Sequence, residues 1–246
     1  MPVFVHALDE LMPKAVKHFW KARKLAVSKQ KNRGISDQGN RAGVTAGKNL
    51  DGFVAMIRQI IQDNGIKDIQ VCYRKRLDLT IPGFYRPTKN WDLLVLFHDL
   101  LIAAVEFKSQ VGPSFGNNFN NRIEEALGNG LDLNTAFREG AFGQSPKPFV
   151  GYFFVLEECT ESTRKVTCNS KYFDVFPDFK ASSYAQRYEI FCRKLVQEQL
   201  YDAATLILTP KDSLRTGEYR NMSEITSARR FATTLAGKIA SIAAGG

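Results

Sequence analysis

WDLLVLFHDLLIAAVEFKSQ, residues 91–110, consists of two apolar runs separated by a short polar turn. Both faces of each run are apolar, which predicts two neighbouring strands buried in a central sheet. Three charged residues interrupt the pattern: Asp92 begins the first run, and Glu106 and Lys108 end the second. Because an unpaired charge is costly to bury, charges at the ends of two buried strands indicate a functional site.

The types and order of these charges favour metal-dependent cleavage of a phosphodiester. Two carboxylates, Asp92 and Glu106, supply hard oxygen ligands for a cation such as Mg²⁺. A neighbouring amine, Lys108, orients or deprotonates the attacking water. The alternative interpretation is that the two acids are strand-end residues in structural ion pairs.

The spacing of the charges can be tested against hairpin geometry. In an antiparallel hairpin, opposed residues have a constant sum of residue numbers, so placing Asp92 opposite Glu106 leaves His98, Asp99 and Leu100 as a three-residue loop. A two-residue loop would instead place Asp92 opposite Val105, on the wrong face. Because both faces are apolar, the pattern itself does not set the register.

Composition excludes several classes of protein and site. The chain has 246 residues, 44% of them hydrophobic, and no apolar run near membrane length, so we expect one domain without a membrane partner, and the cysteine usage favours the reducing cytoplasm. The N-terminal stretch lacks the features of a secretory signal. The four cysteines form no CxxC pair and the three histidines have no metal-ligand spacing, which argues against a structural zinc site and against histidine-metal chemistry.

The basic charge is concentrated near the N-terminus. Residues 14–48 contain ten Lys/Arg and one acid, so the rest of the chain has 24 residues of each sign and the net charge of +9 lies in this segment. Residues 8–31 predict an amphipathic helix with Lys14, Lys17, Lys21 and Lys24 opposite the apolar face. A solvated helix face usually mixes signs, so we expect contact with a polyanion, and a nucleic-acid backbone fits better than a membrane surface.

A glycine-punctuated loop follows this helix, and it carries Arg33, Arg41 and Lys48 as further candidates for DNA contact. The segment AGVTAGKN within it lacks the spacing and the Ser/Thr of a phosphate-binding loop. Together, the basic helix and this loop (about 8–52) form a DNA-contacting elaboration of a single domain spanning 1–246.

Strands are predicted at 69–76, 91–97, 101–108, 149–156 and 203–209, and further helices at 49–63, 117–136, 184–200 and 223–243. The order predicts an α/β or α+β fold with a mixed central sheet flanked by helices, and 159–183 is the expected loop-rich insertion.

Four asparagines and an arginine lie directly after the proposed site, where a loop becomes a helix: Asn117, Asn118, Asn120, Asn121 and Arg122. Asparagine pairs with adenine and arginine with guanine in the major groove, so this cluster is a candidate for base readout or phosphate positioning. The local alternative is that asparagine caps the helix or supports a turn, which accounts for one or two of the four.

These residues carry a resemblance to a known family. Asp92, Glu106-Phe107-Lys108, GPSFGNNFNNRIEEA and the upstream GKNLDGF are similar to the XhoI-type restriction endonucleases, a branch of the PD-(D/E)XK nuclease superfamily, over essentially the whole chain. The resemblance implies a homodimeric type II enzyme that uses Mg²⁺ to cut both strands of a six-base palindrome, CTCGAG in this family, leaving 5′-phosphate ends. Trp91 stands where the superfamily name has proline, at a variable position.

The same resemblance assigns roles to residues. Asp92 and Glu106 would hold the metal, the Phe107 carbonyl would add a ligand, and Lys108 would serve the nucleophilic water. The superfamily often adds an acid from an upstream helix, for which Asp51 is the nearest candidate, although it can also serve only to stabilise the start of the helix at 49–63.

Two rival functions stay open at this point: a PD-(D/E)XK repair or recombination nuclease that ignores sequence, and a non-enzymatic DNA-binding protein whose carboxylates are structural. Restriction would require a cognate DNA methyltransferase as a genetic partner. The last helix is apolar enough to be either dimer surface or core.

Overall fold

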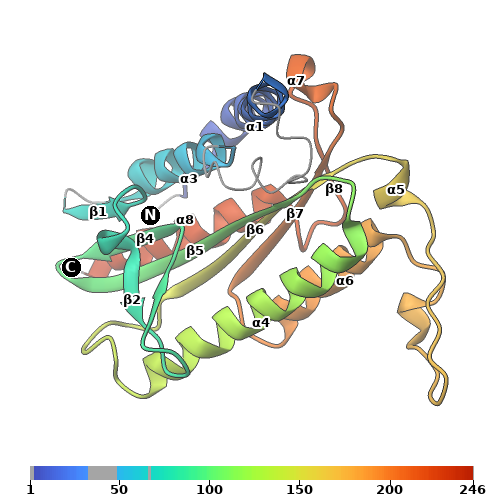
Figure 1. Cartoon of the computed structure of the whole chain (residues 1–246). Helices are drawn as coiled ribbons and strands as arrows, with labels where there is room; N and C mark the ends of the chain where they lie inside the picture. Colours follow the sequence, from blue (N-terminus) through green and yellow to red (C-terminus); the bar gives the residue numbers. More distant parts are fainter. Residues whose placement is uncertain (1–2, 33–48, 66–67, 246) are drawn as a thin grey trace.

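A computed structural model describes residues 3–32, 49–65 and 68–245, and a six-stranded mixed sheet lies at its centre (Figure 1). Three central strands are parallel to one another, and the outer strands run antiparallel to their neighbours. In sheet order the strands are β1 (Ile69–Cys72), β4 (Leu93–Phe97), β5 (Leu100–Gln110), β6 (Phe149–Glu157), β7 (Ala203–Thr209) and β8 (Arg220–Asn221). The predicted mixed sheet flanked by helices is confirmed.

Helices cover both faces of the sheet (Figure 1). One face is covered by α1 (Ala7–Asn32), α3 (Asp51–Asn64) and α8 (Ala228–Gly245), and the other by α4 (Phe115–Arg138) and α6 (Tyr184–Gln197). Side chains that alternate along β5 separate the two cores: Val105 and Phe107 belong to the first core, and Ala104 to the second. Because the alternation continues, Glu106 and Lys108 face the α4 side.

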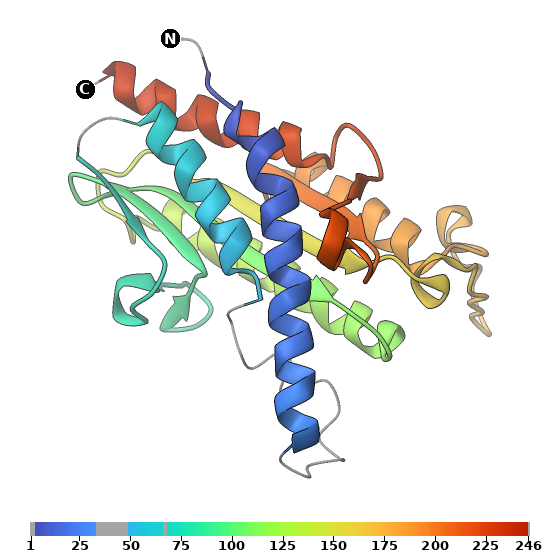
Figure 2. The same cartoon turned by 90° about the horizontal axis from the view of Figure 1, so that it is seen from above.

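The N-terminal helix has the predicted amphipathic form. Leu8, Met12, Ala15 and Phe19 are buried, while the four lysines of the opposite face are exposed. Figure 2 shows the C-terminal part of α1 extending past the rest of the molecule. The last helix belongs to the core, since Phe231, Ala232, Leu235, Ala236 and Ile239 are buried against the sheet and α3.

The β4–β5 hairpin corrects the predicted loop. The loop has two residues, His98 and Asp99, both with positive φ (46° and 66°), and not three. Phe97 therefore pairs with Leu100 and not with Leu101. A β-bulge at Ile102 then shifts the register by one residue, so that Leu93 pairs with Val105. The bulge thus restores the register that puts Asp92 across from Glu106.

Further short elements complete the chain. A separate two-stranded hairpin, absent from the predicted strands, consists of β2 (Thr80–Pro82) and β3 (Thr88–Asn90). The remaining helical turns are η1 (Leu77–Leu79), α5 (Thr160–Thr163), η2 (Pro177–Phe179) and α7 (Ser213–Thr216). The segment 159–183 is loop-rich as predicted; the first strand ends earlier than predicted, at Cys72, and the last helix starts later, at Ala228. Within the described ranges, no helix has the length and apolarity to cross a membrane.

Candidate active site

The two candidate carboxylates come from neighbouring strands on one side of the sheet. Asp92 lies one residue before β4, where its Oδ2 accepts a hydrogen bond of 2.8 Å from the main-chain N–H of Phe107. Glu106 and Lys108 lie two residues apart on β5, so their side chains share a face. Since N–H and C=O of one residue leave a strand on the same side, the Phe107 carbonyl also points past the end of β4.

Glu106 is the most enclosed member of the site. Its side chain is 3% exposed, and each carboxylate oxygen meets an ammonium group. Lys108 Nζ lies 2.5 Å from Oε1, and Lys89 Nζ lies 2.7 Å from Oε2. The predicted trio Asp92, Glu106 and Lys108 is therefore brought together, with Lys89 of β3 as an unpredicted fourth member.

Burial and charge pairing act in opposite directions on the two acids. Burial, reinforced by the nearby Glu106 carboxylate, raises the pKa of Asp92 to about 6. Burial also opposes ionisation of Glu106, but Lys108 and Lys89 outweigh it and lower the pKa of Glu106. Lys108 is desolvated as well, yet Glu106 and Asp92 raise its pKa. Glu106 is thus held ionised, whereas Asp92 takes up a proton near pH 6.

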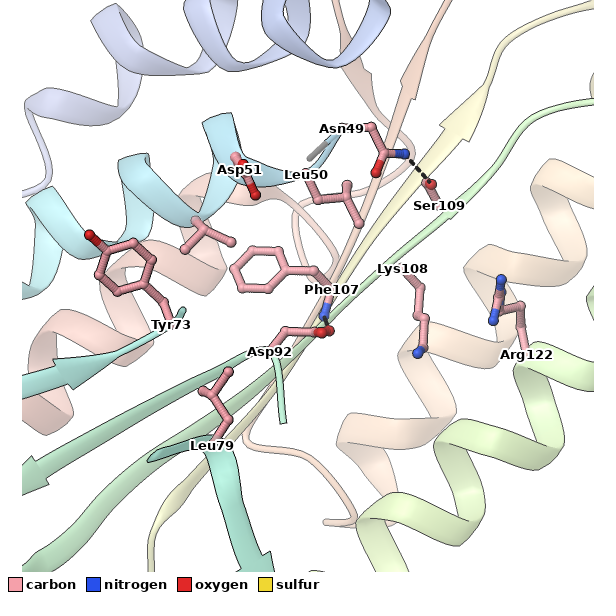
Figure 3. A pocket seen from close by; sticks show the side chains of 11 residues that line it. Asn49, Leu50, Asp51, Tyr73, Leu79, Asp92, Phe107, Lys108, Ser109 and Arg122 are labelled. Carbon is pink, nitrogen blue, oxygen red and sulfur yellow. Dashed lines mark hydrogen bonds between the residues drawn. The ribbon is translucent and has the colours of Figure 1, made fainter. Parts of the chain in front are cut away.

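An open cavity of about 400 Å³ lies at this strand end, between α3, β5 and α4 (Figure 3). Its wall includes Asp92, Lys108 and Ser109, and also Asp51 at the start of α3 and Arg122 of α4. Glu106 is not part of the wall. The cavity thus presents the carboxylates of Asp51 and Asp92 and two cations, while the Glu106 carboxylate lies behind Lys108 and Lys89.

The α4 wall carries its own charged pair. Arg122 Nη1 lies 2.6 Å from Glu125 Oε2, and the same oxygen lies 3.8 Å from Lys108 Nζ. Arg122 and Lys108 therefore flank the same acid, and Figure 3 shows both side chains on the right of the view. A phosphate entering the cavity would meet both cations.

Comparison with known sequences identifies the family of this chain. The sequence model of the family described as "Restriction endonuclease XhoI" matches residues 29–221, which include Asp92, Glu106 and Lys108. The chain belongs to the XhoI family of restriction endonucleases. No solved structure matches the chain.

Relatives in the XhoI family match most of this chain. It is 49% identical to the type II restriction enzyme XhoI of Xanthomonas vasicola over 82% of this chain and 81% of that protein. It is 46% identical to the type II restriction enzyme BstVI of Geobacillus stearothermophilus, over 75% and 84% respectively. Identity to the type II restriction enzyme AbrI of Azospirillum brasilense is 51%, over 68% and 72%.

Two helices of this XhoI-family chain carry the other candidates that the structure describes. The N-cap of α4 is Ser114, so the asparagines lie inside the helix, and none of their side chains has a hydrogen-bond partner among residues 3–32, 49–65 and 68–245. The capping explanation is therefore wrong. Asn117, Asn120 and Asn121 are exposed, while Asn118 and Arg122 are half-buried. Arg33, Arg41 and Lys48 lie outside the described residues.

Asp51 does lie on the cavity wall of this family member, at the first residue of α3. In the view of Figure 3, the Phe107 ring lies between Asp51 and Asp92. Asp51 is exposed and stands in the first turn of α3, where a negative charge also stabilises the helix.

The donor set can be tested against the metal expected for the XhoI family. The described part of the chain contains no group of three or more His, Cys, Asp or Glu side chains that could hold a metal ion. The site offers two carboxylates and the Phe107 carbonyl, all hard oxygen donors. Mg²⁺ keeps several waters and is usually bound through one or two carboxylates, so this set fits it.

Lys89 is the member of the site that the sequence did not indicate. It precedes Asp92 by three residues, in a strand of three residues that also contains Asn90. No periodic pattern or motif distinguishes it from an ordinary surface lysine, and only the fold of the β2–β3 hairpin brings it to Glu106.

Proposed function

We propose that this member of the XhoI family hydrolyses both strands of double-stranded DNA at a palindromic site, with Mg²⁺ as cofactor. The observation that carries the proposal is the register of β4 and β5, which brings Asp92, Glu106 and Lys108 together beside an open cavity. The family resemblance supplies CTCGAG as the expected site and 5′-phosphate ends as the expected product.

In the proposed mechanism, Asp92, Glu106 and the Phe107 carbonyl would hold the cation. Bound Mg²⁺ would supply charge neutralisation for the developing phosphorane and acidity for a coordinated water. Asp92 is positioned by the Phe107 N–H, which bonds Oδ2, so Oδ1 is the oxygen that would bind the cation. Lys108, retained by Glu106 and facing the cavity, aligns the attacking water for in-line displacement.

Contact with DNA is proposed for α4, which lines the cavity, and for the basic helix α1. Arg122 and the exposed asparagines of α4 face the substrate for base reading or phosphate positioning, and the lysines of α1 neutralise the phosphate backbone. A palindrome cut on both strands calls for a homodimer, whose two-fold axis coincides with that of the site.

Two expectations follow from the proposed activity itself. An enzyme that cuts foreign DNA acts in the cytoplasm, where that DNA arrives. The host must protect its own sites, so we propose a cognate DNA methyltransferase as a genetic and not a physical partner.

Digestion of plasmid DNA with and without Mg²⁺, followed by sequencing of the ends, tests this function. Metal-dependent fragments that all end in one palindromic motif would support restriction and give both site and overhang. A metal-dependent smear without a motif would replace it with a sequence-independent nuclease. Absence of cleavage with any divalent metal, by a protein that still binds DNA, would favour the binding-protein alternative.

A further inference from the structure

Glu106 presents a conflict for metal binding, since both of its oxygens are already paired with lysines. Lys108 occupies Oε1 and Lys89 occupies Oε2, and the carboxylate is almost fully buried. A cation that enters from the cavity meets Asp92 first and reaches Glu106 only if one ammonium group leaves. In the metal-free protein, the ammonium groups of Lys89 and Lys108 therefore block both oxygens of Glu106 from a cation.

Lys89 is held at Glu106 by three contacts. Besides Glu106 Oε2, its Nζ donates a hydrogen bond of 3.0 Å to the main-chain carbonyl of Asn90 and lies 4.7 Å from the centre of the Trp91 ring. Its side chain is 11% exposed. The Lys89 charge also acts on Asp92, since it lowers the pKa of that acid. Lys89 thus lies where its charge influences both carboxylates.

We propose that Lys89 is a resident counter-ion that holds Glu106 in the metal-free protein and is displaced when the cation binds. Lys89 is a positioning residue: it pairs with Glu106 Oε2 and orients the carboxylate, and it gives up that oxygen to the metal. The inference rests on the proposed metal role of Glu106.

The supporting structure explains why Lys89 leaves and Lys108 stays. Lys108 projects from β5, a central strand paired on both sides, and has a second acid, Glu125, at 3.8 Å. Lys89 projects from a strand of three residues that pairs only with β2. Glu106 is the one acid within 4 Å of Lys89 among the residues that the structure describes. Displacement of Lys89 therefore breaks one ion pair, whereas displacement of Lys108 would break two.

The hairpin that carries Lys89 is in turn fixed to the DNA-facing helix. Asp132 of α4 accepts hydrogen bonds of 2.7 Å from the N–H groups of Phe84 and Tyr85 at the hairpin tip. It also forms an ion pair of 2.7 Å with Arg86. A Cβ at Gly83 would collide with that carboxylate, so glycine is required there. The position of Lys89 is thereby linked to α4.

Amine-directed acetylation of the full-length protein, quantified by peptide mass spectrometry, tests the displacement directly. Ca²⁺ and Mg²⁺ are each added to metal-free protein without DNA, and the modification rates of Lys89, Lys108 and the surface residue Lys194 are compared. Lys194 is a matched reference because it also pairs with a glutamate, Glu198 at 3.7 Å. We expect metal to raise the rate at Lys89 severalfold while the other two rates stay constant.

Calorimetry on the same proteins gives a second readout. Removal of a competing ammonium should tighten metal binding, so Lys89→Met is expected to bind Ca²⁺ about tenfold more tightly than the parent. Lys89→Arg, which keeps a charge able to pair with Glu106, should not gain affinity, and Lys194→Met should bind as the parent does.

The outcomes separate this inference from the proposed function. Metal binding with Lys89 still protected, release of Lys108 in its place, or no affinity gain in Lys89→Met would overturn the inference and leave the nuclease proposal intact. If neither the parent nor Lys89→Met binds metal, the metal site itself is refuted, and both proposals fail. Because acetylation is measured on the unaltered sequence, a variant that folds poorly does not affect that readout.

Discussion

Asp92 and Phe107 are joined by a hydrogen bond of 2.8 Å from the main-chain N–H of Phe107 to the Asp92 carboxylate. This contact continues the pairing of the two strands one position beyond Leu93, using a side chain where β4 has ended. The contact places the Asp92 carboxylate beside Glu106 and leaves Oδ1 of Asp92 available to a ligand. The chemistry of the proposed site depends on this position.

Loss of either carboxylate is expected to separate cleavage from binding. Asp92→Asn and Glu106→Gln should reduce cleavage by at least about a thousandfold, since a metal ligand is lost. DNA binding should survive or tighten, because a negative charge near the scissile phosphate is removed. Plasmid cleavage and gel-shift assays measure the two effects. Asp99→Asn, at the exposed tip of the same hairpin, is the matched control and should cut normally. Loss of DNA binding in a folded Asp92→Asn protein would contradict the assigned role.

Asp92 should also make stability depend on pH in the metal-free protein. Its pKa of about 6 lies above its ordinary value of 3.8, so the folded state binds the proton more tightly than the unfolded state. Stability is therefore lost as the pH rises from about 4 to 6, by roughly 1–3 kcal/mol in the free energy of unfolding.

Asp92→Asn removes this cost but keeps an oxygen that can accept from the Phe107 N–H. In urea unfolding with EDTA, the variant should exceed the parent in stability at pH 8 and lose that advantage towards pH 4. A variant that is less stable than the parent at pH 8 would show that Asp92 is a structural acid. Added Mg²⁺ should stabilise the parent and not the variant.

Charge on α1 should control DNA affinity without regard to sequence. Lys14 is paired with Glu10, whereas Lys17, Lys21 and Lys24 have no ion pair within the described ranges. Replacement of these last three with Gln should weaken binding to all sequences about equally and reduce the salt-dependence slope by about two to three. Salt titration of binding measures the slope, with Lys194→Gln as the control. An unchanged slope would argue against phosphate contacts by α1.

The anchor of the β2–β3 hairpin is expected to contribute to stability. Asp132→Ala would leave the N–H groups of Phe84 and Tyr85 and the Arg86 guanidinium without their acceptor. We expect a loss of about 2–4 kcal/mol in the free energy of unfolding, and faster acetylation of Lys89 without metal, because the hairpin is loosened. Asp174→Ala, at an exposed acid of the loop-rich segment, is the control and should change neither measurement. Equal acetylation rates in parent and Asp132→Ala would show that the hairpin keeps its place without this anchor.

Elements with strong hydrophobic patterns could be predicted from the sequence. The runs that became β4, β5, β6 and β7 were recognisable because they are buried on both faces, and α1 because its apolar residues recur with helical spacing. The proposed catalytic trio was recognisable for the same reason: Asp92, Glu106 and Lys108 interrupt apolar runs.

Features that depend on tertiary contacts were not predictable in this way. The β2–β3 hairpin has strands of three residues, half-buried or exposed, with a proline in one of them. Lys89 therefore lay outside any recognisable element. The approach of Lys108 to Glu125 likewise depends on α4 packing beside β5, which the sequence pattern does not specify.

The bulge at Ile102 separates two properties that a regular hairpin would link, the length of its loop and the alignment of its far end. Adding one residue at the turn and removing the bulged residue shift the pairing of the two strands in opposite directions, so the two changes cancel at Asp92 and Glu106. Insertions and deletions near His98 can therefore accumulate during divergence while the acids at the other end keep their alignment. An alignment of related sequences that gains a residue at the turn and loses one near Ile102 therefore does not by itself mean a changed active site, since the spacing between the two acids stays the same.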